Sequence, residues 1–205
     1  MILVHHLRVG RSVFTVWLLE EMGLDYELKI YVRNEMGRAP PELREAHPLG
    51  KSPVIVDDGL MVAETGAIAS YLVDRYDTEN RFAPPREDVA ARAEWTTWLH
   101  YPEGSAFMPL LMTMLLGREK DPKPPILSAF TAGEVKLHLS YMENAIGDQD
   151  FLLGDTFSAV DVGFTYIASM AERLGLLKAY PKLDAYRERN MKRPAFLRAV
   201  EKTGG

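Results

Sequence analysis

The hydrophobic pattern changes character near residue 80 of this 205-residue chain, and that change limits the folds it can adopt. Short apolar stretches and one alternating stretch, separated by helical patterns, fill the first third, as expected of a domain that mixes strands and helices. Beyond residue 88 every periodic stretch has helical spacing. We therefore predict an α/β domain over residues 1–77, an all-helical domain over residues 88–205, and a polar linker, Asp77–Asp88, between them.

The first 32 residues predict a strand, a helix and a second strand. Ile2–Val4 is short, apolar and partly β-branched, whereas the apolar residues of Ser12–Met22 follow helical spacing until Gly23. Tyr26–Val32 alternates, which indicates a strand with one wetter face. Because a β-α-β unit normally forms a parallel pair with a right-handed crossover, we expect the two strands to lie parallel.

A hairpin and another helix complete this α/β region. Two apolar triplets, Val54–Val56 and Leu60–Val62, flank the turn Asp57–Gly59, and an Asp-Gly pair is a good hairpin signal. Glu64–Tyr76 then has helical spacing, and Pro41–Ala46 is compatible with a short helix. The pattern thus predicts the order β-α-β followed by β-β-α.

Long helical patterns make up the second region. Ile126–Ile146 is amphipathic, whereas Ala159–Leu174 is apolar almost all round, which is typical of a helix buried in a bundle. Ser158 and Asp161 have the spacing of an N-terminal capping box. Pro109 is expected to kink or break the helical stretch that contains it.

Charge and cysteine content argue against several classes of protein. The chain has 24 Lys and Arg against 29 Asp and Glu, a net charge of −5, so a nucleic acid or an anionic membrane is a poor partner. Cysteine is absent, which excludes disulfides, cysteine-ligated metals and a catalytic cysteine of the protein's own. No metal-binding motif occurs, and the most apolar stretch, Phe107–Leu116, is ten residues long, whereas a membrane span needs about 20. We expect a soluble, cytoplasmic protein with no metal, no membrane and no nucleic acid among its partners.

One set of candidate site residues lies where the first strand meets the first helix. In an open α/β sheet, ligands bind outside the carboxyl ends of the parallel strands, and Gly10-Arg11-Ser12 occupies that turn. Ser12 also belongs to the residue types that cap helix N-termini, so capping alone is an alternative interpretation.

Two further segments offer groups that suit a peptide-like ligand. In Lys51-Ser52-Pro53-Val54 a proline enters a strand from a loop; a cis peptide there would expose the Val54 backbone, and an ordinary loop proline is the alternative. Glu64-Thr65 begins a helix, where free N–H groups and the helix dipole favour a carboxylate. With the Glu64 carboxylate as partner for an ammonium, this end would hold a zwitterionic amino-acid head group. Simple capping is again the alternative.

In their order these segments resemble the soluble, or cytosolic, glutathione S-transferases, and the similarity covers nearly the full length. His47–Val54 is similar to the family segment Asn-Pro-x-Gly-Lys-x-Pro, with His47 in the place of Asn. Glu64–Leu72 is similar to Glu-Ser-x-Ala-Ile-x-x-Tyr-Leu, and Phe157–Asp161 to a capping segment that usually contains Thr-x-Ala-Asp. Trp98–Ser105 is similar to a stretch in bacterial and fungal members.

The resemblance implies a thioredoxin-like N-terminal domain, a C-terminal helical bundle, and glutathione as a co-substrate without a metal. It implies that Glu64 and Thr65 hold the γ-glutamyl head, and that the Val54 backbone, after a cis Pro53, pairs with the cysteinyl backbone like an added strand. Lys51 and Arg38 are implied partners of the glycyl carboxylate, and Ser52 completes the implied glutathione-binding set.

The group that activates the thiol is where the chain departs from the family pattern. Members use Tyr, Ser or Cys near the end of the first strand; here Cys is absent, and His5 or His6 stands where a Tyr would fall. That leaves Ser12, with Arg11 beside it, as the predicted catalytic pair. Bacterial relatives often have Ser-Arg-Ser at this turn, and Gly10 replaces their first serine.

For the second substrate the resemblance implies a small, largely apolar electrophile bound between the domains. Met and aromatic side chains adapt to varied apolar shapes, and the alternative for each Met is the bundle core. The candidate wall residues are Tyr101, Ser105, Met108 and Met112. The predicted activity is glutathione transfer in a homodimer, with a role in detoxification. A glutathione-dependent peroxidase or disulfide reductase is the alternative, and a non-catalytic glutathione-binding or assembly module is a further one.

Overall fold

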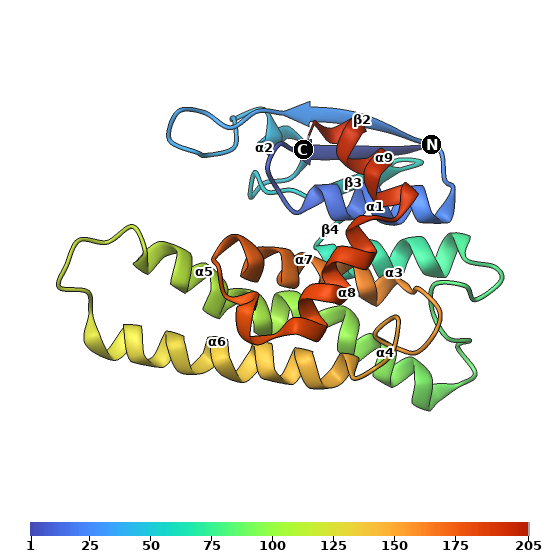
Figure 1. Ribbon diagram of the computed structural model, residues 1–205. Helices are drawn as coiled ribbons and strands as arrows, with labels where there is room; N and C mark the ends of the chain where they lie inside the picture. Colours follow the sequence, from blue (N-terminus) through green and yellow to red (C-terminus); the bar gives the residue numbers. More distant parts are fainter. Residues whose placement is uncertain (205) are drawn as a thin grey trace. The chain divides into compact units, whose positions relative to one another are not determined.

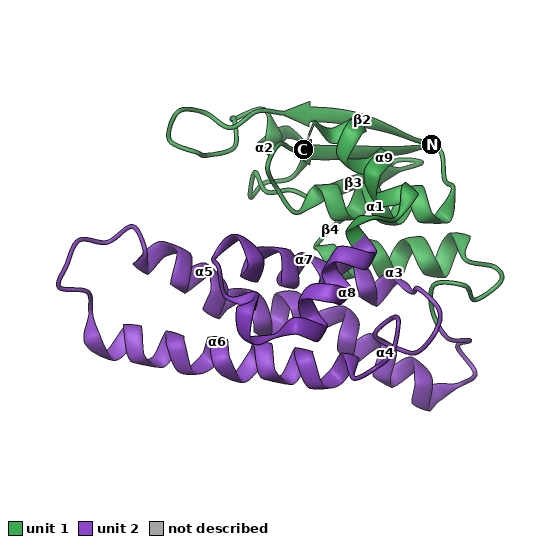
Figure 2. Ribbon diagram, viewed as in Figure 1, with its two compact units in different colours: residues 1–83, 191–205 green, residues 84–190 purple. Residues whose placement is uncertain are grey.

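The computed structural model describes residues 1–204, which group into two compact units. One unit contains residues 1–83 and the C-terminal segment that begins at Met191; the other contains Pro84–Asn190 (Figure 2). The domain ranges expected from the sequence remain a prediction, and the compact units add one feature to them: the end of the chain packs with its beginning.

The first unit is built on a four-stranded mixed sheet with the order β2-β1-β3-β4 (Figure 1). β1 pairs with β2 in parallel, and the β1–β3 and β3–β4 pairs are antiparallel, which confirms the predicted parallel pair, the hairpin and the thioredoxin-like class. The elements of this unit are β1 (Ile2–Leu7), α1 (Ser12–Met22), β2 (Tyr26–Tyr31), α2 (Leu43–Ala46), β3 (Val54–Asp57), β4 (Leu60–Ala63), α3 (Thr65–Tyr76) and α9 (Pro194–Thr203).

The two faces of β1 bury different neighbours because side chains alternate along a strand. Leu7 packs with Tyr31 of β2 and Leu43 of α2 in a small apolar cluster. His6, which points to the opposite face, hydrogen-bonds Ser12 at the start of α1. Both faces of β1 are therefore covered. Hydrogen bonds link the end of this strand to Ser12, the first residue of α1.

Helix α9 completes this unit by packing against α1 (Figure 1). The ring of Phe196 lies 5.2 Å from that of Trp17, edge to face, and both side chains are buried. Beside this contact the largely buried Glu20 carboxylate accepts hydrogen bonds from Arg198 at 2.7 Å and from Lys202 at 2.6 Å. Sequence periodicity gave no reason to expect that residues from opposite ends of the chain share one core.

The second unit is a helical bundle, as predicted. Its elements are α4 (Val89–Tyr101), the π-helical turn η1 (Pro102–Ala106), α5 (Phe107–Leu116), α6 (Pro125–Ile146), α7 (Ala159–Arg173), the short 3₁₀ turn η2 (Leu177–Ala179) and α8 (Pro181–Met191). The predicted helix α7 begins after Ser158, whose N–H donates to the Asp161 carboxylate at 2.7 Å, as expected of a capping box. Within residues 1–204 no helix is both long and apolar enough to span a bilayer.

The predicted break near Pro109 takes the form of the π-helical turn η1. The Phe107 N–H donates to the Pro102 carbonyl, five residues back, so one extra residue is accommodated before α5 begins. Pro109 then falls in the first turn of α5, a position where proline is tolerated.

Candidate active site

The turn between β1 and α1 approaches its own backbone closely. A Cβ atom at Gly10 would lie 2.6 Å from the Leu7 carbonyl oxygen, so no side chain fits there without a backbone shift. Val9 has a φ of 54°, in the left-handed region that a β-branched residue seldom adopts. The Arg33 guanidinium holds the turn from outside, donating to the carbonyls of Arg8 at 3.2 Å and Val9 at 3.3 Å. A serine at position 10, as in many bacterial relatives, would therefore require this turn to shift.

Ser12, the predicted thiol-activating residue, is fully buried beneath this turn. Its Oγ lies 2.9 Å from His6 Nδ1 and accepts a hydrogen bond from the Leu7 N–H at 3.3 Å. Burial lowers the pKa of His6, and the Thr203 carbonyl opposes that shift only in part. The hydroxyl is therefore engaged inside the unit, whereas the neighbouring Arg11 is half-buried.

The Ser52–Pro53 peptide bond is cis, as the family resemblance implied. The Ser52 hydroxyl donates to the His5 carbonyl at 2.7 Å and accepts from the Leu7 N–H at 3.2 Å, so it fastens the turn to β1. Val54 begins β3 and pairs with His5 on one side and Ala63 on the other. Ser52 lies just before this ladder starts.

Glu64 occupies a strained backbone position at the N-terminus of α3. Its φ of 73° and ψ of 127° lie outside the regions that residues other than glycine normally adopt. Its side chain is exposed and makes no capping hydrogen bond. Thr65, half-buried, is the first residue of the helix. Strain of this kind costs about 1–3 kcal/mol and clusters at ligand-binding positions.

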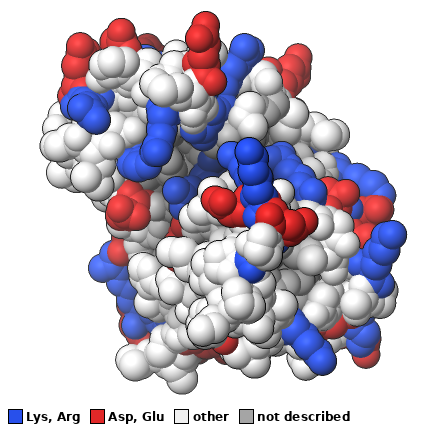
Figure 3. Space-filling model, turned by 90° about the vertical axis from the view of Figure 1, so that its left-hand side faces the viewer, with Lys and Arg blue, Asp and Glu red and all other residues white. Residues whose placement is uncertain are grey.

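Two exposed cations precede this region in the chain. Lys51 and Arg38 are exposed, and neither side chain forms an ion pair with another residue in the described range 1–204. The Arg38 N–H donates to the Asn34 side chain at 2.9 Å, which fixes the loop that carries it. On the face drawn in Figure 3, Lys and Arg side chains are interspersed with Asp and Glu side chains.

The residues predicted for the second substrate differ in exposure and in contacts within the helical unit. Ser105 and Met108 are exposed and Met112 is half-buried, whereas the Tyr101 hydroxyl lies 2.8 Å from His138 Nδ1 on α6. On its other side His138 Nε2 lies 3.6 Å from the Glu134 carboxylate. Burial, with a smaller effect from Tyr141, raises the pKa of Tyr101, so this phenol stays neutral at physiological pH.

Sequence reasoning missed the partners that hold these groups in place. His138 had one usable signal, its i, i+4 spacing from Glu134 on a predicted helix. Arg33 had no sequence signal, because its hydrogen-bond acceptors are backbone carbonyls, which every residue has. Among residues 1–204 no group of three or more His, Asp or Glu side chains is arranged to hold a metal ion.

Comparison with known proteins gives the family. The profile of the glutathione S-transferase N-terminal domain matches residues 1–74, and that of the C-terminal domain matches residues 105–194. Glutathione S-transferase 3 of Schizosaccharomyces pombe is 34% identical over 98% of this chain and 88% of its own length. Glutathione S-transferase 1 of Saccharomyces cerevisiae is 29% identical over 91% of this chain and 88% of its own.

Solved structures agree with the sequence relatives. A glutathione S-transferase from Actinobacillus pleuropneumoniae is 36% identical and superposes with a TM-score of 0.90 over 100% of this chain and 94% of its own. A glutathione transferase homologue from Lodderomyces elongisporus, with two glutathione molecules per subunit, has the same fold at 22% identity and a TM-score of 0.83, over 98% of each chain. This chain belongs to the glutathione S-transferase family and is an enzyme of that family.

Proposed function

We propose that the first unit binds glutathione and makes its thiol anionic for attack on a small, largely apolar electrophile. The observation that carries the proposal is Glu64: a strained, exposed carboxylate at the N-terminus of a helix, in a chain whose relatives are named glutathione S-transferases. In this proposal its carboxylate binds the γ-glutamyl ammonium. The N–H groups at the start of α3 and the Thr65 hydroxyl bind the neighbouring carboxylate.

The other end of the tripeptide meets the cationic groups. We place the glycyl carboxylate at Lys51 and Arg38, which are exposed and without an acidic partner in the part of the chain that is described. The cysteinyl backbone pairs beside the cis Pro53, next to Val54. Because Val54 is already flanked by β1 and β4, the backbone at Ser52 is the part of the segment that a ligand reaches first.

Thiol activation requires preferential binding of the anion. A free thiol has a pKa near 8.5, and lowering it by about two units needs ~2.7 kcal/mol. We assign this to Arg11 and to the N–H groups and dipole at the start of α1. In this proposal Ser12 has a structural role, because its hydroxyl bonds to His6 and Leu7 inside the unit.

The test compares two neighbouring variants by titrating bound glutathione through its thiolate absorbance. Arg11→Ala is expected to raise the thiol pKa by about one unit, the loss of a charge-assisted hydrogen bond. Ser12→Ala is expected to leave that pKa nearly unchanged while lowering the temperature of unfolding. An equal rise in both variants would show that the hydroxyl itself contacts the sulfur. No calorimetric heat with millimolar glutathione would reject the whole proposal.

Activity assays separate the transferase from the alternatives named above. Conjugation of a chloro-nitroaromatic is expected to exceed turnover of a hydroperoxide or a small disulfide, because the chain has no cysteine to form a mixed disulfide. The homodimer, the cytoplasmic location and the role in detoxification are further parts of the proposal and rest on the family resemblance. Light scattering of the purified protein tests the dimer.

A further inference from the structure

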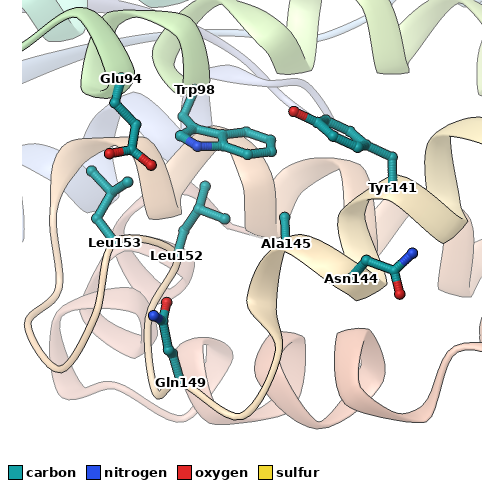
Figure 4. A pocket seen from close by; sticks show the side chains of 8 residues that line it. All are labelled: Glu94, Trp98, Tyr141, Asn144, Ala145, Gln149, Leu152 and Leu153. Atoms are coloured by element: carbon teal, nitrogen blue, oxygen red, sulfur yellow. The ribbon is translucent and has the colours of Figure 1, made fainter. Parts of the chain in front are cut away.

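The helical unit contains an open pocket of about 540 Å³ that the proposed reaction does not use. This volume lies in the usual range of small-molecule sites. The pocket is formed by α4, α6 and the loop that follows α6 (Figure 4). Its walls are Glu94, Trp98, Tyr141, Asn144, Ala145, Gln149, Leu152 and Leu153.

One wall of the pocket is a pair of stacked aromatic rings. The rings of Trp98 and Tyr141 have centroids 5.3 Å apart and planes 22° from parallel. Trp98 is only 8% exposed and packs edge to face on Phe164 and Tyr101, so it supports the wall from behind and offers a ligand little of its own ring. Tyr141 is 48% exposed, and its ring extends from α6 toward Trp98 (Figure 4). Aromatic faces attract cations as well as flat apolar groups.

The pocket carries one carboxylate and no cation. Glu94 stands beside Trp98 on α4, with its carboxylate toward Leu153 (Figure 4). In the described chain Glu94 makes no hydrogen bond or ion pair. Its charge is therefore available to a ligand.

Nearby cations are engaged elsewhere. The Arg92 guanidinium lies 4.4 Å from the centre of the Trp95 ring and donates to the Pro84 carbonyl. Arg189 donates to the backbone carbonyls of Gln149 and Asp150, and Lys182 bonds Asp148. The electrostatic character of the pocket is thus set by Glu94, with the amides of Asn144 and Gln149 as neutral polar groups at its border.

We propose that this pocket binds a small organic cation with a flat aromatic body and an ammonium group. The ring of the ligand lies against Tyr141 and Leu152, with Trp98 behind them, and its ammonium pairs with Glu94. Each half of such a ligand meets a matching surface: the apolar body is removed from water, and the positive charge is next to both a carboxylate and aromatic faces. A neutral or anionic aromatic compound meets only one of these two conditions.

The experiment titrates the full-length protein by calorimetry with phenethylamine, which is cationic at neutral pH. Two probes of similar shape serve as references, the neutral 2-phenylethanol and the anionic 3-phenylpropanoate. Phenethylamine is expected to bind about tenfold tighter than the alcohol, and the anion weakest. The preference should fall as salt is raised, because Glu94 is exposed.

Matched variants locate the site. Glu94→Gln is expected to abolish the preference for the amine over the alcohol, whereas Glu172→Gln, at an exposed position of α7, should leave it unchanged. Tyr141→Leu should weaken all aromatic probes. Both Glu94→Gln and Tyr141→Leu should keep wild-type retention on glutathione resin, which separates this proposal from the function proposed above.

Three results would overturn the proposal. They are equal affinity for amine and alcohol, an amine preference that survives Glu94→Gln, and no binding of any probe at millimolar concentration. The third result would also arise if a second copy of the chain covered the pocket, and it would count against a ligand site in either case.

Discussion

The Glu64 backbone, with φ at 73° and ψ at 127°, adopts a conformation that costs about 1–3 kcal/mol in a residue with a side chain. Nothing in the fold of α3 requires it, since a helix can begin from an ordinary extended residue. We infer that the strained conformation serves ligand binding, because it holds the carboxylate where a ligand ammonium can reach it.

Two substitutions separate the backbone contribution of Glu64 from that of its carboxylate. Glu64→Gly relieves the strain and is expected to raise the free energy of unfolding by about 1 kcal/mol, while Glu64→Ala keeps the strain and leaves stability nearly unchanged. Both are expected to lose retention on glutathione resin. Denaturant unfolding and resin binding measure the two effects. A destabilised Glu64→Gly variant would show that the conformation is not strained.

Single residues are also where sequence reasoning reached its limit. The motifs placed Ser12 and Ser52 near the ligand, and both lie beside the turns that the proposal assigns to it. Their hydroxyls, however, bond to His6, Leu7 and His5 inside the fold. A spacing shows that a residue is near a site, but the direction of its side chain depends on partners far along the chain.

At the scale of elements, the α1–α9 contact depends on a carboxylate with a strongly shifted pKa. Burial would raise the pKa of Glu20, but hydrogen bonds from Lys202, Tyr26 and Arg198 outweigh it and lower the value from 4.5 to about 2. Because the folded-state pKa is the lower one, the stabilisation is fully present above pH 4.5. It is lost as the pH falls toward 2.

Glu20→Gln is therefore expected to destabilise the protein by about 2 kcal/mol at pH 7, a value reduced from the full shift because Arg198 and Lys202 are half-exposed. The difference from wild type should shrink between pH 4.5 and pH 2. Urea unfolding at a series of pH values measures this. Glu201→Gln, an exposed position on α9, is the control and should change little. A difference that stays constant with pH would contradict the assigned cause.

Most helices and strands could be predicted because each has a local signal in the sequence. Helical spacing ending at Gly23 gave α1, and the Asp-Gly turn gave the β3–β4 hairpin. The π-helical turn η1 could not be placed from Pro109 alone, because a proline marks a lost hydrogen bond but not which neighbouring turn absorbs it. Tyr101, which precedes this turn, contacts His138 on α6, whereas Ser105 and Met108, within and after it, are exposed.

At the scale of the whole molecule, the chain returns to its first unit after completing the second. Helix α9 is amphipathic in the structure, but such a pattern in a sequence does not say which element covers the apolar face. In the structure that face covers α1, where Phe196 contacts both Trp17 and Phe14. The last helix of the chain is thus part of the core of the first unit.

Phe196→Ala tests this dependence. It removes a side chain that is 5% exposed from an aromatic cluster, so the free energy of unfolding is expected to fall by about 3–5 kcal/mol. Leu197→Ala, at a position 56% exposed on the same helix, should change stability by less than about 0.5 kcal/mol. Retention on glutathione resin should be lost at a lower temperature in Phe196→Ala, although no ligand group is altered. If the two variants unfolded alike, the last helix would be an attachment to the first unit and not part of its core.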